Sequence, residues 1–187
     1  MRTYQVAVIV GSLRQASLNR KFAQALQGLA PEHLKLEILS VDQLPLYNEE
    51  ADGNEVPEVL RFREAVRAAD AVLIVSPEYN RSMTAVLKNA LDQGSRPWGQ
   101  NAWAGKPVAL AGVSPGAAGT SMAQQHTRNV LSYLDMRAMS QPEMFLQAKE
   151  DMFHADGSLS DRSAAFAQKF LSAFGIWVVD HLGDKQP

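Results

Sequence analysis

The sequence predicts an α/β fold, in which a doubly wound, five-stranded parallel sheet carries helices on both faces. Short apolar runs alternate with longer amphipathic segments along the chain. The runs at 70–76 (DAVLIVS) and 107–113 (PVALAGV) are apolar at almost every position, as is typical of strands covered on both faces. Because strands that alternate strictly with helices are joined by crossover connections, the sheet is expected to be parallel.

Each element has its own local signal. YQVAVIV at 4–10 is rich in β-branched residues, and LKLEIL at 34–39 alternates between apolar and polar. The helical segments repeat apolar residues every three or four positions, and Asn54 and Pro57 are a candidate cap and first-turn residue for the second helix. The predicted strands are 4–10, 34–39, 70–76, 107–113 and 135–139, and the predicted helices are 19–29, 57–69, 82–93, 119–134 and 160–181.

Two long polar connections, 41–56 and 141–159, are either functional segments or plain surface loops. No repeat or linker interrupts the pattern, so residues 1–187 are expected to form one domain.

Composition excludes several classes of protein. The formal charge of −2 offers no basic field for nucleic acid or an anionic membrane. The absence of cysteine excludes disulfides, thiolate nucleophiles and cysteine-ligated metal centres, and the four scattered histidines show no metal-ligand spacing. Because the apolar run near the N-terminus is too short for a signal peptide or a membrane span, a cytoplasmic location is expected.

The segment after the first strand, GSLRQASLN at 11–19, contains residue types that are typical of a phosphate-binding site. Ligands of an open parallel sheet bind beyond the carboxyl ends of its strands. Gly11 permits a tight turn, Ser12, Ser17 and Asn19 offer polar side chains at a helix N-terminus, and Arg14 adds a planar cation. The alternative is a plain helix cap at Ser17 or Asn19. There is no G-x-G-x-x-G and no Walker lysine pattern, which argues against dinucleotide and P-loop sites.

Two further segments follow the third and fourth predicted strands. In SPEYNRS at 76–82, Pro77 favours an extended turn whose backbone can face a flat heteroaromatic edge, Tyr79 can line a ring, and Asn80 can donate and accept. SPGAAGT at 114–120 is small enough for close approach of a ligand. The alternatives are a cap for the next helix and a flexible connection, and Glu78 is expected to be a solvated loop charge.

The chain resembles the NADPH-dependent FMN reductase family, and within it the bacterial chromate and quinone reductases. The resemblance rests on GSLRxxSxN (11–19), LPLYN (44–48), PEYNxS (77–82), LKNALD (87–92) and AGKP (104–107), where x is any residue, and these motifs occur in this order. It implies a flavodoxin-like fold, bound FMN and a homodimer or homotetramer. It also implies that Ser12, Arg14, Ser17, Leu18 and Asn19 hold the FMN phosphate, that Pro77, Glu78, Tyr79 and Asn80 line the isoalloxazine, and that Ser114 and Gly116 close its other edge. Relatives often have proline where Thr84 stands, and a glycine and a basic residue where Thr120 and Met122 stand.

These observations predict an enzyme that passes electrons from NADPH or NADH, through FMN, to a quinone, free flavin or another small oxidant such as chromate. No side chain need act as acid or base, and one open flavin face serving both substrates implies ping-pong kinetics. Trp98 and Trp103 are expected to lie in a two-fold interface. The alternatives are a flavodoxin-type electron carrier, although the weak net charge and SLR at 12–14 are unlike flavodoxins, and a slow FMN-binding redox sensor.

Overall fold

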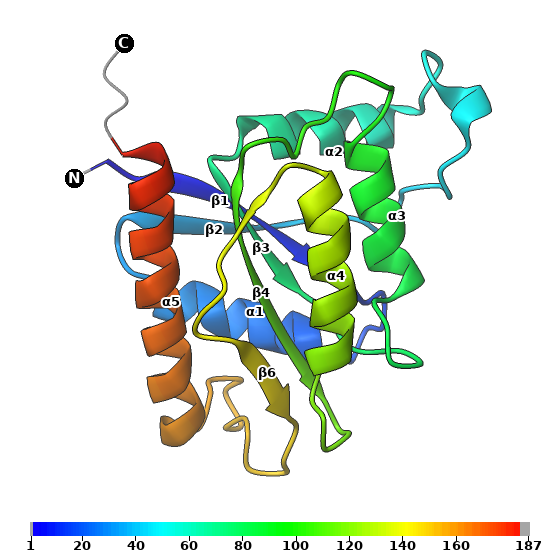
Figure 1. The fold of residues 1–187 in the computed structure, drawn as a ribbon. Helices are drawn as coiled ribbons and strands as arrows, with labels where there is room; N and C mark the ends of the chain where they lie inside the picture. The colour runs from blue at the N-terminus through cyan, green and yellow to red at the C-terminus, as the bar shows by residue number, and fades with distance from the viewer. Residues whose placement is uncertain (1, 184–187) are drawn as a thin grey trace.

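The computed structural model describes residues 2–183, which form a parallel sheet with helices on both faces (Figure 1). The strand order is β2-β1-β3-β4-β5, with β6 also paired to β4, and every pair is parallel. The strands are β1 (Tyr4–Val10), β2 (Leu34–Leu39), β3 (Ala71–Val75), β4 (Pro107–Ser114), β5 (Arg137–Ala138) and β6 (Met144–Gln147). The order 2-1-3-4-5 is that of flavodoxin-like sheets, so the predicted fold class is confirmed.

Five α-helices and one short 3-10 helix connect the strands. They are α1 (Leu18–Leu29), η1 (Glu49–Ala51), α2 (Pro57–Ala68), α3 (Ala85–Gly94), α4 (Ser121–Tyr133) and α5 (Asp161–Leu182). Helices α1 and α5 cover one face of the sheet, and α2, α3 and α4 cover the other (Figure 1).

Each face of the sheet has its own hydrophobic core. Because successive residues of a strand point to opposite faces, Val8 packs toward α1 and α5, whereas its neighbour Ile9 packs toward α2 and α3. Phe22, Phe170 and Phe174 are fully buried on the first side. Trp103 is fully buried on the second side, where its indole N–H donates to the Leu91 carbonyl at 2.9 Å. The expectation that Trp103 lies in a subunit interface is therefore wrong, because this side chain belongs to the core.

The last position of the sheet is divided between two short strands. Strand β5 pairs with the first residues of β4, and β6 pairs with Ala111–Ser114 further along it. The sequence predicted one strand at 135–139 and a polar connection from 141 onward, so β6 corrects that part of the prediction. Met144 is buried at 0% exposure against β4, which gives this segment its place in the core.

The starts of α3 and α4 and the cap of α2 also differ from expectation. Helix α3 begins at Ala85 rather than residue 82, because Asn80 and Arg81 have φ of 52° and 61° and belong to a tight turn. Helix α4 begins at Ser121, after Gly119 at φ 59°. The N-cap of α2 is Val56, which makes no side-chain cap bond, so Asn54 is not its cap, although Pro57 does occupy the first turn.

Candidate functional site

The connections that follow β1, β3 and β4 gather at the carboxyl end of the sheet (Figure 1). Glycines allow these strand ends to approach one another closely. A Cβ on Gly11 would lie 2.2 Å from Ser76 Oγ, and one on Gly112 would lie 2.3 Å from the Ser76 carbonyl oxygen. The predicted site segments, although far apart in the sequence, therefore lie side by side.

The β1–α1 connection presents unpaired donors. Ser17 is the N-cap of α1, and its Oγ accepts the Arg20 backbone N–H at 3.2 Å. Within residues 2–183, the backbone N–H groups of Leu18 and Asn19 donate to no protein acceptor. The first turn of α1 contains no acidic residue. This helix end therefore keeps open N–H groups and an uncompensated partial positive charge.

Ser12 and Arg14 add to these donors. Ser12 is buried, and its Oγ accepts the Arg14 backbone N–H at 3.4 Å, which leaves the hydroxyl proton free to donate. The Arg14 side chain is exposed and forms no ion pair with any residue between 2 and 183. A free guanidinium beside two hydroxyls and open backbone N–H groups suits a phosphate monoester.

Asn19 has a different role from its neighbours. Its Nδ2 donates to the Val113 carbonyl at 2.8 Å, and its Oδ1 accepts the Val113 N–H at 2.9 Å. Asn19 is buried, so this pair of bonds fixes the start of α1 to the end of β4. Asn19 therefore positions the helix end.

Thr84, where relatives often carry proline, joins the β1 and β3 connections. Its Oγ1 donates to the Gly11 carbonyl at 2.8 Å and accepts the Leu87 N–H at 3.1 Å as the N-cap of α3. Both functions need a hydroxyl, which explains the threonine. Sequence reasoning noted Thr84 only as a departure from its relatives and missed its capping role, although a threonine three positions before a helical apolar residue is an ordinary N-cap signal.

Glu78 caps a helix on a different connection. Its Oε2 accepts the backbone N–H groups of Met122 and Ala123, both at 3.0 Å, at the start of α4. Thr120, the N-cap residue of α4, makes no side-chain cap bond, so Glu78 supplies the missing acceptor. Glu78 is thus an anchor between the β3 and β4 connections and not the solvated charge that the sequence suggested.

The rest of these two connections stays open to solvent. Tyr79 is 50% exposed, and its N–H and C=O pair with those of Ser82 at 3.0 Å each to form a two-residue turn through Asn80. Pro77 is half-buried at the strand end. Ser114 accepts the Gly116 N–H at 3.3 Å, and residues 115–118 are exposed. A Cβ on Gly116 would meet only Ser114 Oγ, at 3.6 Å, so packing within the protein does not require glycine there.

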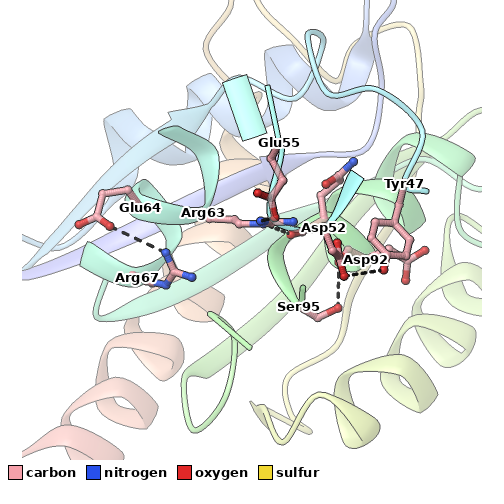
Figure 2. A network of polar contacts seen from close by, with 9 residues as sticks. Tyr47, Asp52, Glu55, Arg63, Glu64, Arg67, Asp92 and Ser95 are labelled. Atoms are coloured by element: carbon pink, nitrogen blue, oxygen red, sulfur yellow. Dashed lines mark hydrogen bonds and ion pairs between the residues drawn. The ribbon is translucent and has the colours of Figure 1, made fainter. Parts of the chain in front are cut away.

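The long 41–56 connection is fastened to α2 and α3 beside the site. Asn89 accepts the Tyr47 N–H at 2.9 Å and donates to the Pro45 carbonyl at 2.8 Å. Figure 2 shows the carboxylate of Glu55 against the guanidinium of Arg63, which is only 2% exposed. The hydrogen bond from Arg63 holds the pKa of Glu55 below its ordinary value.

Exposed aromatic and apolar side chains gather where the 41–56 connection meets the segment after α3. The Arg96 guanidinium carbon lies 5.3 Å from the ring centre of Tyr47 and 5.9 Å from that of Trp98. Leu46 is 79% exposed and Trp98 78%. We call Leu46, Tyr47, Arg96 and Trp98 the aromatic patch.

Other classes of site find little support. In residues 2–183, no three His, Cys, Asp or Glu side chains gather as a metal site would require. Across that same range, no helix combines the length and hydrophobicity needed to cross a bilayer. Hollows of about 580 and 560 Å³ lie next to the 146–160 segment. Their lining residues include none of the predicted site residues, so these two hollows are separate from the carboxyl-end connections described above.

The residues at the carboxyl end of the sheet fit FMN. The open end of α1, with the hydroxyls of Ser12 and Ser17 and the cation of Arg14, matches a phosphate dianion. The exposed backbone at 77–80 and 114–118 can approach a flat ring from two sides.

Comparison with known proteins agrees with this geometry. Residues 4–151 match the family model of the NADPH-dependent FMN reductases. The chain is 49% identical over 178 residues to a quinone reductase of Pseudomonas putida, which covers 95% of this chain and 96% of that one. It is 47% identical over 178 residues to a 2-hydroxy-1,4-benzoquinone reductase of a Burkholderia species, covering 94% and 97%. The structure of FerB, a flavoenzyme NAD(P)H:(acceptor) oxidoreductase from Paracoccus denitrificans, superposes with a TM-score of 0.91 at 42% identity, covering 96% and 99%. The chain therefore belongs to the NADPH-dependent FMN reductase family, and is a flavoenzyme that uses FMN and a nicotinamide coenzyme.

Proposed function

We propose that this enzyme reduces quinones, taking its electrons from NADPH or NADH through FMN held at the carboxyl end of the sheet. The observation that carries the proposal is the open N-terminus of α1, where the described residues offer no acceptor to the backbone N–H groups of Leu18 and Asn19. The hydroxyls of Ser12 and Ser17 and the exposed guanidinium of Arg14 belong to the connection that leads into this helix end. The quinone reductases that share almost half of the residues of this chain support the choice of acceptor.

Individual residues have separate roles in this proposal. Ser12, Arg14, Ser17 and the backbone of Leu18 bind the phosphate, and Asn19 holds that helix end against β4. The backbone of Pro77, Tyr79 and Asn80 lines one edge of the isoalloxazine, and Ser114 and Gly116 line the other. Glu78 keeps these two edges at a fixed separation by capping α4.

FMN, when bound, supplies the redox chemistry, since its ring can take up an electron pair from nicotinamide and release it to an acceptor. The overall exchange consumes one NAD(P)H, one proton and one quinone, and yields one NAD(P)⁺ and one quinol. The side chains of the site bind and orient, and none of them has to transfer a proton.

We further propose that the coenzyme and the acceptor occupy the same open side of the site in turn. The exposure of Tyr79 and of residues 115–118 supports one shared entrance. Free flavin and an oxidised metal anion such as chromate are further acceptors that such an entrance would admit. Steady-state rates should give parallel double-reciprocal lines, and intersecting lines would exclude a shared entrance.

We also propose that residues 1–187 act as one FMN-binding domain that assembles into a homodimer or homotetramer through the aromatic patch. Exposed apolar side chains beside a stacked arginine are typical of protein interfaces. Replacing both Leu46 and Trp98 with serine should lower the mass of the assembly measured by light scattering. The control Tyr133→Ser, also at a highly exposed position, should leave that mass unchanged. A monomeric parent protein at micromolar concentration would contradict the assembly.

The reducing cytoplasm, where both coenzymes are available, is the proposed compartment.

The test of the function is an absorbance spectrum of the purified protein with added FMN, followed by anaerobic NADPH or NADH and then a benzoquinone. We expect bound flavin that bleaches with coenzyme and recovers its colour with quinone over many turnovers. Bleaching without rapid turnover on any acceptor would favour the carrier or sensor alternatives. A protein that takes up no FMN would contradict the proposal.

A further inference from the structure

Arg81 stands at a backbone position that ordinarily favours a different residue. Asn80 and Arg81 form the two central positions of the turn between Tyr79 and Ser82, with φ of 52° and 61°. Both values lie in the left-handed region, where two-residue turns favour Asn-Gly and where a long side chain at the second position costs stability. Asn80 follows this preference, and Arg81 does not.

The guanidinium of Arg81 is held in place but has no counter-charge. Its Nη1 lies 3.8 Å from the Met122 sulfur at the start of α4, which orients the side chain toward that helix. Arg81 is exposed, and in the described range 2–183 it forms no ion pair. The nearest acidic side chain in sequence is Glu78, whose Oε2 accepts the two N–H groups of α4. A cation that is oriented and unpaired is well suited to an anionic ligand.

This cation is separate from the one assigned to the FMN phosphate. Arg14 precedes α1, which covers one face of the sheet (Figure 1). Arg81 precedes α3 and contacts Met122 at the start of α4, and these two helices cover the opposite face (Figure 1). The two guanidiniums therefore belong to different connections at the carboxyl end of the sheet, and Arg81 directly follows the proposed isoalloxazine edge, Pro77–Asn80. A second phosphate-bearing molecule that stacks its ring at this edge would extend its phosphates outward, past the turn.

We propose that Arg81 binds a phosphate group of the nicotinamide coenzyme. This inference rests on the proposed function, since it assumes that the coenzyme reaches bound FMN at this edge. Two phosphates of the coenzyme share the required chemistry: the 2′-phosphate, which only NADPH carries, and the bridging diphosphate, which both coenzymes carry. Binding of the 2′-phosphate would make the enzyme selective for NADPH.

The test compares Arg81→Gly and Arg81→Gln with the parent protein. The control is Arg162→Gln, at an exposed arginine that forms no ion pair with the residues that the structure describes. The steady-state KM for NADPH and NADH is measured with FMN bound, and the equilibrium affinities for NADP⁺ and NAD⁺ are measured by calorimetry. Loss of one charge-assisted contact should raise the affected KM about tenfold at nearly constant kcat. The Arg162→Gln control should leave both KM values unchanged.

The outcomes separate the two phosphates from each other and from a structural role. An increase confined to NADPH and NADP⁺ assigns Arg81 to the 2′-phosphate, and equal increases for both coenzymes assign it to the diphosphate. Arg81→Gly should also raise the midpoint of thermal unfolding, because glycine relieves the left-handed turn, so weaker binding would accompany a more stable protein. Unchanged KM values and affinities in an enzyme that still loads FMN and oxidises coenzyme would overturn this inference and leave the proposed function intact.

Discussion

Helices α1 and α4 both begin at the carboxyl end of the sheet, but their first-turn N–H groups differ in whether they have protein acceptors. In α4, all four first-turn N–H groups have protein acceptors, two of them on the Glu78 carboxylate. In α1, two find no acceptor among residues 2–183, the first turn contains no acidic residue, and Arg14 forms no ion pair within the same range. Both ends carry the same partial positive charge, so the difference lies in what the sequence places beside them.

This contrast separates the binding end from the anchoring end. A helix N-terminus that already holds a carboxylate has little affinity left for a phosphate, because its donors are used and its charge is compensated. We therefore propose that the open end of α1 receives the FMN phosphate, whereas the closed end of α4 is anchored to the connection after β3. Substitutions at the N-terminus of α1 should therefore change the affinity for FMN, and substitutions at the N-terminus of α4 should change stability.

The largest effect should follow from giving α1 the carboxylate that α4 already has. Ser17→Asp keeps a good N-cap, so the protein should fold, but it sets a negative charge against the phosphate. Repulsion of at least about 4 kcal/mol would weaken FMN binding by about 1000-fold or more. Flavin fluorescence titration measures the affinity. Ser17→Asn, a neutral cap, is the control, and tight binding by Ser17→Asp would show that the phosphate lies elsewhere.

A smaller loss should follow from removing the cation alone. Arg14→Ala deletes one charge-assisted contact, worth about 1.5–3 kcal/mol, and should raise the FMN dissociation constant about 10- to 100-fold. Because Arg14 is exposed and forms no ion pair in the described structure, thermal stability without flavin should not change. An unchanged dissociation constant would remove Arg14 from the site.

The closed end should respond in stability more than in flavin affinity. Glu78→Ala leaves two N–H groups of α4 without their acceptor, and should lower the free energy of unfolding by about 1–2 kcal/mol. Glu78→Gln, which keeps an acceptor oxygen, should lower the free energy of unfolding by a smaller amount. Urea unfolding of the flavin-free protein measures both variants. If Glu78→Ala raised the FMN dissociation constant more than Arg14→Ala does, Glu78 would have a role in binding FMN besides anchoring α4.

The smallest effect should be the acid response of the other anchoring carboxylate, Glu55. Because Arg63 depresses its pKa, its contribution to stability is complete above the ordinary value of about 4.5 and is lost as the pH falls through the lower value of the folded protein. Unfolding free energies measured from pH 6 to pH 3.5 should fall less steeply in Glu55→Gln than in the parent protein. Parallel curves would exclude this carboxylate as a source of the acid response.

The parallel sheet was accessible from the sequence, and so was the gathering of the three predicted segments at its carboxyl end. Apolar runs such as 70–76 identify buried strands, and the geometry of parallel sheets then brings their carboxyl ends together. Of the two alternative cap residues, Ser17 and Asn19, Ser17 is the N-cap of α1, and this too was accessible because capping depends on residues only three positions apart.

The partners of the anchoring residues were not accessible, because they are set by tertiary packing. Asn19 bonds to Val113, 94 residues away, and Glu78 bonds to Met122, 44 residues away. Residue type alone suggested a ligand contact for the first and a solvated charge for the second. Strand β6 was missed because its four residues gain their β-structure from pairing with β4.

A comparison of FMN with riboflavin tests the central claim most directly, since the two molecules share the ring system and differ by the phosphate. Dissociation constants of both are measured for the parent protein and for Arg14→Ala by fluorescence titration. If the open end of α1 holds the phosphate, FMN should bind about 1000-fold more tightly than riboflavin, and Arg14→Ala should weaken only FMN. Affinities within about fivefold of each other in the parent protein, a difference of only about 1 kcal/mol, would contradict the account.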